Sequence, residues 1–298
     1  MNRVASRAVM VLLPFILAGY AFALPQDTVD FTKPPAKGLK YKVIQKRTGQ
    51  SETTLAVSDR EPREISQTTS GKMVFTQTIL EVKDGKIVKL DRVYEEAGSR
   101  TENDQMPEPR EQENPLAWKH IRAEWNEDGE CKVEIKEGDE WTEPEDKMKR
   151  RLRPQMLRNP LIPLPEESKK VGDSWELDEE AAKKFFGKPP TLPGEDAPEI
   201  EREAKFKITG ITDFKEMKCA VIKMVSKISV DESMSQTMEA TCYYSLKHCI
   251  IVGMKGTGTN RVNRTMERGE MIFEIDSSGT QKINAEVKIL GPESQDEE

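Results

Sequence analysis

Apolar and polar residues alternate along most of the chain, and this period of two predicts β-strands. In the first half the alternation covers residues 39–44, 53–57, 73–82, 118–125 and 131–135. In the second half it covers residues 204–211, 219–230, 235–246, 250–263, 270–277 and 281–289. Several of these stretches exceed the usual strand length of about five or six residues. We therefore expect a mainly β fold whose long antiparallel strands form a curved sheet or a partial barrel.

Short turn sequences separate these stretches at the spacing of hairpins. Asp84-Gly85 is the clearest of them, because a two-residue type I′ turn needs positive φ at both central positions. If these two residues form the loop, Phe75 lies opposite Tyr94, and Ile79 lies opposite Leu90. Apolar cross-strand pairs on one face indicate a half-buried sheet.

Two helices interrupt the strand pattern near the middle of the chain. Thr142-Glu143-Pro144-Glu145 has the capping residues of a helix N-terminus and predicts a helix as far as Arg153. The basic side chains of this helix are Lys147, Lys149, Arg150, Arg151 and Arg153. A second, short helix is expected over about residues 178–186, where Ala181, Ala182, Phe185 and Phe186 form its apolar side.

Two polar stretches are expected to lie outside the strands. Residues 98–115 are acidic and contain three prolines, which predicts a long loop. Ser278-Gly279 predicts a turn that separates the strands at 270–277 and 281–289.

The first residues have the pattern of a secretory signal peptide. Arg3 and Arg7 precede an apolar run over 9–22, and Ala21-Phe22-Ala23 supplies a small-x-small cleavage site. The run is shorter than the about 20 apolar residues of a membrane span, so we expect cleavage after residues 1–23 and no transmembrane anchor. The sequence therefore predicts an exported protein, periplasmic or extracellular.

The rest of the chain reads as one β-rich domain with two strand-rich halves. The pattern leaves open whether the halves share one sheet or form two packed lobes. The expected segments are a polar lead-in at 24–38, a domain at 39–290 with halves 39–140 and 171–290 joined by 142–165, and an acidic disordered tail at 291–298.

Charge and cysteine content narrow the range of partners. The formal net charge of −7 argues against nucleic acid. The four cysteines include no Cys-x-x-Cys pair, so neither a zinc ribbon nor a thioredoxin-type redox site is expected. They can be packed thiols or form one disulfide. For a disulfide the sequence favours Cys219 with Cys242, which lie at nearly matching distances from the turn at 231–233.

The sequence lacks the common catalytic motifs. His120 and His248 are its only histidines, which argues against a multi-histidine metal site and a histidine-based triad. GxSxG, SxxK, HExxH and Walker A motifs do not occur. Residues 124–129 resemble the start of a calcium loop, but Ile135 stands where that loop needs a bidentate Glu. We expect no cofactor and no metal, and a non-enzymatic protein rather than an enzyme.

One short motif resembles a known family. Val171-Gly172-Asp173-Ser174-Trp175 follows a Pro-containing approach and is similar to the VGDxW-type turn in a family of exported bacterial proteins of unknown function. The resemblance implies a strand that begins near Trp175 and identifies no functional residue. More distantly, long antiparallel strands that curve over a helix and a loop resemble the lipoprotein-carrier half-barrels of the bacterial envelope, which implies acyl-chain binding.

Three hypotheses of function follow. The first is a non-catalytic envelope protein that binds an apolar or lipid-like ligand on a concave sheet. Its candidate lining residues, which suit a core equally well, are Phe75, Tyr94, Trp118, Trp125, Trp141 and Trp175. The second is a module that binds a protein or an anionic polymer through the basic side chains at 147–153. The third is a hydrolase with a carboxylate site that no motif reveals.

Overall fold

The fold was analysed in a computed structural model. It describes residues 27–58, 60–137, 152, 157–158, 161–186, 200–231, 233–268 and 271–291. The expected signal peptide, Trp141, the five basic side chains of the helix predicted at 142–153, and the acidic tail beyond Gly291 lie outside the described residues.

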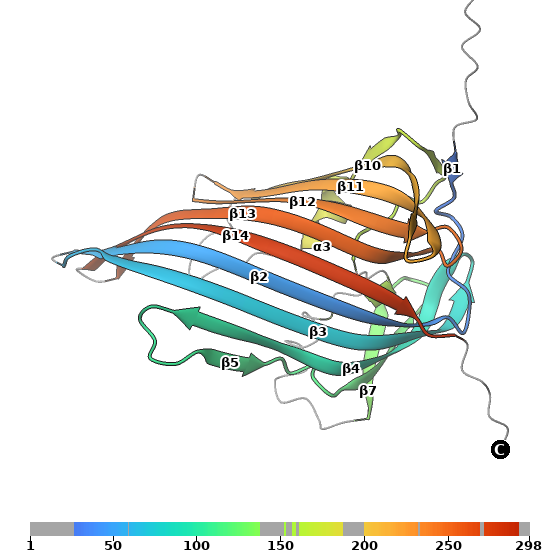
Figure 1. The fold of residues 1–298 in the computed structure, drawn as a ribbon, viewed down its shortest axis with the longest axis horizontal. Helices are drawn as coiled ribbons and strands as arrows, with labels where there is room; N and C mark the ends of the chain where they lie inside the picture. Colours follow the sequence, from blue (N-terminus) through green and yellow to red (C-terminus); the bar gives the residue numbers. More distant parts are fainter. Residues whose placement is uncertain are drawn as a thin grey trace, which may run out of the picture.

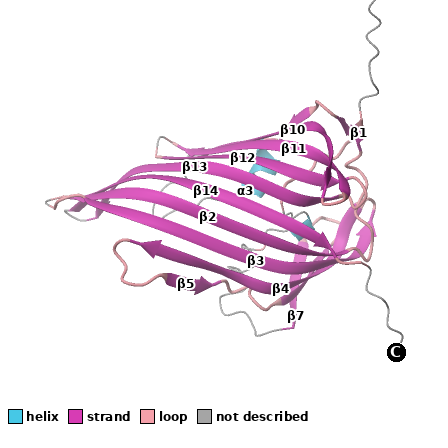
Figure 2. Cartoon of the chain, viewed as in Figure 1, coloured by secondary structure: helices cyan, strands magenta, loops and turns pink. Residues whose placement is uncertain are grey.

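The described strands form one large antiparallel sheet and a small two-stranded one (Figure 1). The long strands are β2 (Lys40–Val57), β3 (Arg63–Lys83), β4 (Lys86–Asn103), β10 (Ile200–Phe214), β11 (Met217–Val230), β12 (Met234–Ser245), β13 (Ile250–Arg268) and β14 (Met271–Ile289). The short strands are β1 (Thr28–Val29), β5 (Arg110–Glu113), β6 (His120–Trp125), β7 (Cys131–Glu137), β8 (Lys169–Lys170) and β9 (Ser174–Glu176). Helix α3 spans Glu179–Phe186, and Figure 2 shows how small its share of the chain is beside the strands.

Neighbouring strands of the large sheet are mostly consecutive in sequence, with one important exception. The order is β7-β6-β4-β3-β2-β14-β13-β12-β11-β10-β9, with β5 paired to the far end of β4, and β1 pairs with β8 apart from it. Strand β14 pairs with β2 over its length, from Ile289 opposite Tyr41 to Phe273 opposite Val57. The two strand-rich halves therefore share one open sheet, which resolves the alternative that the sequence left open and confirms the mainly β fold.

The local sequence signals for the hairpin at Asp84-Gly85 and for the short helix near residues 178–186 are confirmed. Asp84 and Gly85 both have positive φ, at 49° and 74°. The hairpin places Phe75 opposite Tyr94 and Ile79 opposite Leu90, as expected. Helix α3 starts where expected, because Asp178 Oδ1 accepts a hydrogen bond of 2.7 Å from the Ala181 amide.

Strand lengths were underestimated. Strand β2 is continuous from Lys40 to Val57, where two strands were predicted. Strand β14 runs through Ser278-Gly279, so the turn prediction is wrong there, and the predicted loop at 98–115 contains the end of β4 and all of β5. The reason is that β14 has a hydrogen-bonded neighbour on both sides, and this pairing outweighs the turn preference of two residues.

The predicted disulfide is wrong. All four cysteines are free thiols. Cys219 lies opposite Ser245, whereas Cys242 lies opposite Ile222, three positions further along β11. Because side chains alternate between faces, this odd offset places Cys219 and Cys242 on opposite faces of the sheet. The two cysteines lie at similar distances from the turn at 231–233, but the difference between these distances is an odd number of residues, so the side chains cannot meet on one face.

One end of the sheet holds the hydrophobic core, which we call the packed end. There the start of β2, the end of β14 and their neighbours bury large side chains, such as Tyr41, Val287 and Phe206, against the lead-in and the linker. Leu157, Leu161 and Ile162 of the linker are fully or nearly fully buried in the same cluster. The core-facing surface continues beyond this cluster onto the other half of the long strands, which we call the distal half.

Glycines on the core-facing surface allow neighbouring strands to converge. A Cβ on Gly279 would lie 2.6 Å from Asn260 Oδ1 and 2.8 Å from the carbonyl oxygen of Gln50. A Cβ on Gly258 would lie 2.7 Å from the Thr237 carbonyl oxygen. Opposite Cβ atoms in a sheet are normally about 4.5 to 5.5 Å apart. This crowding on one face is what a sheet curved toward that face requires.

We expect Gly279→Ala to destabilise the protein by about 1 to 3 kcal/mol, because the added methyl group meets a backbone oxygen that cannot rotate away. Gly71→Ala is the matched control, since a Cβ there would lie at an ordinary 3.6 Å from the Gly98 carbonyl oxygen. That control should be neutral or stabilising by up to about 1 kcal/mol. Urea unfolding of both variants measures the difference, and equal stabilities would contradict the crowding argument.

We expect Cys219 and Cys242 to resist alkylation in the folded protein. Burial raises the pKa of the Cys219 thiol to about 11 and that of Cys242 to about 12, so little thiolate is present at pH 8. Iodoacetamide followed by peptide mass spectrometry should leave both unmodified in buffer and modify both in urea without reductant. A bridged Cys219–Cys242 peptide pair would contradict the structure.

Candidate binding site

The register of the sheet assigns each strand residue to one of two faces. Residues opposite each other on neighbouring strands point to the same side. The inner face, which carries the core, is formed by odd-numbered residues of β2, β3 and β14 and by even-numbered residues of β10 to β13. The alternation of burial along β2 and β14 agrees with this assignment.

In the distal half of these seven strands, the described side chains of the inner face include no acidic residue and no lysine. In the distal half its apolar residues are Leu55, Val57, Ile65, Ile228, Met234, Met238, Val262, Phe273 and Ile275. Between them lie small and amide side chains, namely Gly49, Ser51, Thr53, Gln67, Thr69, Gln236, Asn260, Ser277 and Gln281. In this half the acidic residues and lysines of the same strands lie on the outer face, Lys46, Glu52, Glu64, Lys255, Glu274, Asp276 and Lys282 among them.

A groove of about 270 Å³ lies on the inner face near the middle of the long strands. Its inner-face lining comes from β2, β3, β12, β13 and β14, and consists of Arg47, Gly49, Ser51, Gln67, Thr69, Met234, Gln236, Asn260, Val262 and Gln281. Strands β3 and β12 are separated by three others, a path of roughly 19 Å along a sheet at about 4.8 Å per strand. That both line one groove indicates that the sheet curls around it.

Arg47 and Gln281 form the polar centre of the groove. The Arg47 guanidinium donates a hydrogen bond to Gln281 Oε1. Gln281 is 7% exposed, and its side chain lies over Gly258, where a Cβ would come within 3.2 Å of its Cγ atom. Only glycine at position 258 leaves room for the amide in this orientation. Gln281 therefore holds the guanidinium of Arg47 in the groove.

The aromatic residues expected to line a ligand site do not line this groove. Phe75, Tyr94 and Trp125 are buried in the core at the packed end. Trp175 stacks on Phe206 with ring centroids 5.1 Å apart. Trp118 is 69% exposed, donates its indole N–H to Glu113 Oε1 at 3.1 Å, and borders a second cavity of about 470 Å³ that Arg47 also lines.

A buried polar network at the packed end explains part of that core. Arg92 donates to Gln77 Oε1 from Nε at 2.9 Å and to the Leu157 carbonyl oxygen at 3.1 Å, while its guanidinium lies 4.1 Å from the centre of the Phe75 ring. Gln77 in turn donates to the Tyr41 hydroxyl at 2.6 Å. Each of these polar groups has a hydrogen-bond partner within the protein, so the network stabilises the core.

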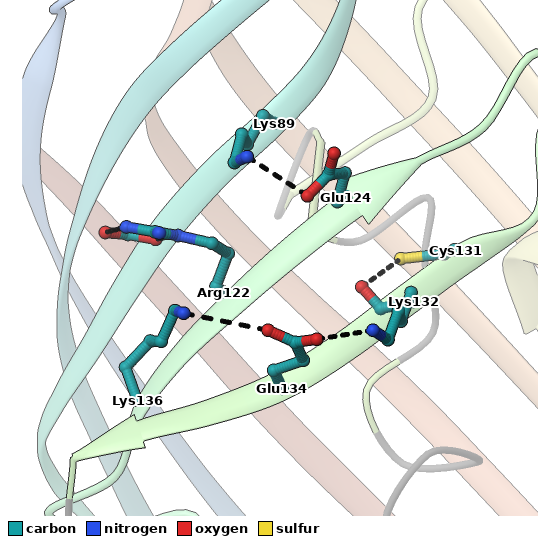
Figure 3. Close-up of polar contacts among 8 residues, drawn as sticks. Lys89, Arg122, Glu124, Cys131, Lys132, Glu134 and Lys136 are labelled. Atoms are coloured by element: carbon teal, nitrogen blue, oxygen red, sulfur yellow. Dashed lines mark hydrogen bonds and ion pairs between the residues drawn. The ribbon is translucent and has the colours of Figure 1, made fainter.

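The charged groups of β4, β6 and β7 form ion pairs at one end of the sheet (Figure 3). Lys89 lies 3.1 Å from Glu124, and Glu134 lies between Lys132 and Lys136. Asp91 accepts two hydrogen bonds of 2.7 Å from Arg122. Burial is the largest single influence and tends to raise the pKa of Asp91, but the hydrogen bonds and charges of Arg122 and His120 together outweigh it and lower the pKa from its ordinary value.

This ion-paired region has no arrangement that indicates catalysis. His120 Nε2 lies 3.3 Å from Asp91 Oδ2, but that carboxylate is already held by Arg122. Within the part of the chain that the structure describes, no three His, Cys, Asp or Glu side chains gather as a metal site would need. The pairs are therefore best read as cross-strand stabilisation.

No protein-family model and no curated protein matches the chain. The solved structures similar to it share little sequence. Lipovitellin, described with its lipid–protein interactions, is 10% identical with a TM-score of 0.43 and covers 87% of this chain, which spans only 26% of the lipovitellin chain. The P. putida toluene transporter TodX is 5% identical, with a TM-score of 0.19, and the matched region covers 86% of this chain and 91% of the TodX chain.

A third similar structure is DynF from the dynemicin biosynthesis pathway of Micromonospora chersina. It is 10% identical, with a TM-score of 0.18, and covers 97% of this chain and 96% of its own. None of these likenesses is close enough to assign a function. The helices of the described residues include none that is both long and apolar enough to cross a membrane.

We expect Asp91→Asn to lower the free energy of unfolding at pH 7 by about 1 to 2 kcal/mol, since it breaks a bidentate pair with a half-buried arginine. The pKa of Asp91 is lower in the folded state than in the unfolded state. Its contribution to the free energy of unfolding is therefore fully present above the unfolded pKa of about 3.9 and is lost as the pH falls through the folded pKa. The difference from wild type should therefore shrink below about pH 4.

Glu124→Gln is the control for this experiment, because its pair with Lys89 is more exposed and should contribute less than about 0.5 kcal/mol. Urea unfolding between pH 3 and pH 7 gives both comparisons. A loss for Asp91→Asn that does not change with pH would contradict the role assigned to its charge.

Proposed function

We propose that this chain is an exported, non-catalytic binding protein that holds the apolar chain of an amphipathic ligand on the inner face of its sheet. The observation that carries the proposal is the absence of acidic residues and lysines from the described side chains of that face in the distal half. The leader pattern at residues 1–23 supports export.

The free energy for such binding comes from apolar surface that the protein leaves half-exposed. Leu55, Ile65, Val262, Phe273 and Ile275 all lie on the inner face of the distal half and are only partly buried. Each Å² of apolar area removed from water contributes about 25 cal/mol. At the packed end the same face is covered by residues of the chain itself, such as Leu157 and Leu161.

The small and amide side chains suit an apolar chain with a polar end. Glycine, serine and threonine on the inner face of β2 and β14 have short side chains, so a ligand can lie close to the backbone. Gln67, Gln236 and Asn260 supply hydrogen-bonding groups without a net charge that would have to be desolvated. The groove volume of about 270 Å³ is near the lower end for small-molecule sites.

We expect Val262→Glu to weaken binding of a neutral apolar dye by about tenfold or more, because the added carboxylate must be desolvated beside the ligand. Asn263→Glu is the matched control, since Asn263 is the next residue on β13 and is exposed on the outer face. Fluorescence titration with N-phenylnaphthylamine measures both. Equal dye binding by the two variants, or none by the wild type, would rule out the inner face as the site.

A further inference from the structure

We infer that the ligand is an anionic amphiphile whose carboxylate or phosphate head group is bound by Arg47. The inference rests on the function proposed above and specifies the chemistry of the ligand. It comes from the sign and the type of the charges on the inner face, which the apolar residues alone do not determine.

In the distal half of the seven strands, every charged residue on the inner face whose side chain the structure describes is an arginine. These residues are Arg47, Arg63, Arg202 and Arg264. Lysines are common on the outer face of the same strands, for example Lys46, Lys255 and Lys282. If the inner face needed only positive charge for solubility, lysine would serve equally well. A planar guanidinium differs from an ammonium in that it binds carboxylates and phosphates through two parallel hydrogen bonds.

Arg47 is the arginine that lines the groove. Its described contact is the hydrogen bond to Gln281, a neutral acceptor, and among the described residues no carboxylate lies within ion-pair distance of it. On the outer face nearby, two cations have anionic partners, since Lys42 pairs with Glu95 and Lys72 pairs with Glu96. Arg47 thus carries a positive charge that the protein orients, and the described part of the chain supplies no anionic partner for it.

The orientation of Arg47 is imposed by residues far from it in sequence. Gln281 lies 234 positions away and faces the groove because β14 pairs with β2, where Gln281 lies opposite Gly49. The missing side chain at Gly258 makes room for the Gln281 amide. A neutral amide that holds one N–H of a guanidinium leaves the other donors available to a ligand.

The apolar part of the ligand would lie beside this charge. Met234 and Val262 line the same groove as Arg47. Ile275 and Phe273 continue the apolar surface along β14 away from the packed end. A head group at Arg47 therefore leaves an acyl or alkyl chain to lie along the distal half of the inner face.

Arg92 shows what a structural arginine looks like in this fold. It is 5% exposed, and its guanidinium contacts Gln77, Tyr94 and the Leu157 carbonyl oxygen. Arg92 lies in the core and not in a groove. Arg47, in contrast, lines a groove that a ligand can reach.

The test compares ligands that share one chain length and differ only in the head group. A long-chain fatty acid, an alkyl phosphate and a fatty alcohol are titrated against dye-loaded wild-type protein at pH 8. We expect the acid or the phosphate to bind at least tenfold more tightly than the alcohol, and the tighter of the two identifies the head group.

Substitution then assigns the preference to one residue. Arg47→Gln should weaken binding of the anionic ligand by about tenfold and leave alcohol binding unchanged. Arg47→Lys, which keeps the charge but loses the two-donor geometry, should give an intermediate loss. Arg261→Gln is the control, because Arg261 is an exposed arginine on the outer face of β13. Urea unfolding of each variant confirms that it is folded.

The outcomes separate the inference from the function on which it rests. If the alcohol binds as tightly as the acid and the phosphate, or if Arg47→Gln weakens none of them, the inference is overturned while the binding function stands. If none of the three ligands displaces the dye from wild-type protein, the proposed function fails, and the inference fails with it.

Discussion

The pairing of β14 with β2 is the interaction on which the rest of the structure depends. It joins the last long strand to the first, so two sets of hairpins become one sheet. Without it each set would end in a long unpaired edge, with backbone donors and acceptors exposed to other chains. With it the inner face runs without interruption from β3 to β10. The groove is built across this ladder, because Arg47 and Gln281 come from its two strands.

The curvature of that sheet explains the composition of its two faces. On the concave side neighbouring strands converge, and glycine at positions such as 258 and 279 is needed because any Cβ would meet a neighbouring carbonyl oxygen. On the convex side strands diverge, and long charged side chains fit and remain in water. A carboxylate on the concave side would be partly desolvated without a partner, which costs free energy. Arginine is tolerated there since it can be held by a neutral amide.

The fold could be predicted from the sequence to the extent that it is local. The turn at Asp84-Gly85 and the short helix expected at about residues 178–186 depend on nearby residues only, and the structure confirms both. The continuity of β14 through Gly279 could not be predicted, because it depends on partners on both sides that are distant in sequence. The absence of acidic residues at alternate positions of β2 was visible in the sequence. The groove was not, since no pattern reveals that Gln281 faces Arg47.

Phe75, Tyr94 and Trp125, which the sequence offers as candidate ligand contacts, are buried in the core instead. A packed core requires large side chains to fill its volume, whereas a groove requires small ones to leave volume free. Phe75 and Tyr94 pack against each other at the packed end, with ring centroids 5.5 Å apart. Gly49 and Ser51 occupy the same face of the sheet where it is hollow. In a curved sheet, a binding site is therefore better sought where small residues repeat on the inner face than where aromatic residues gather.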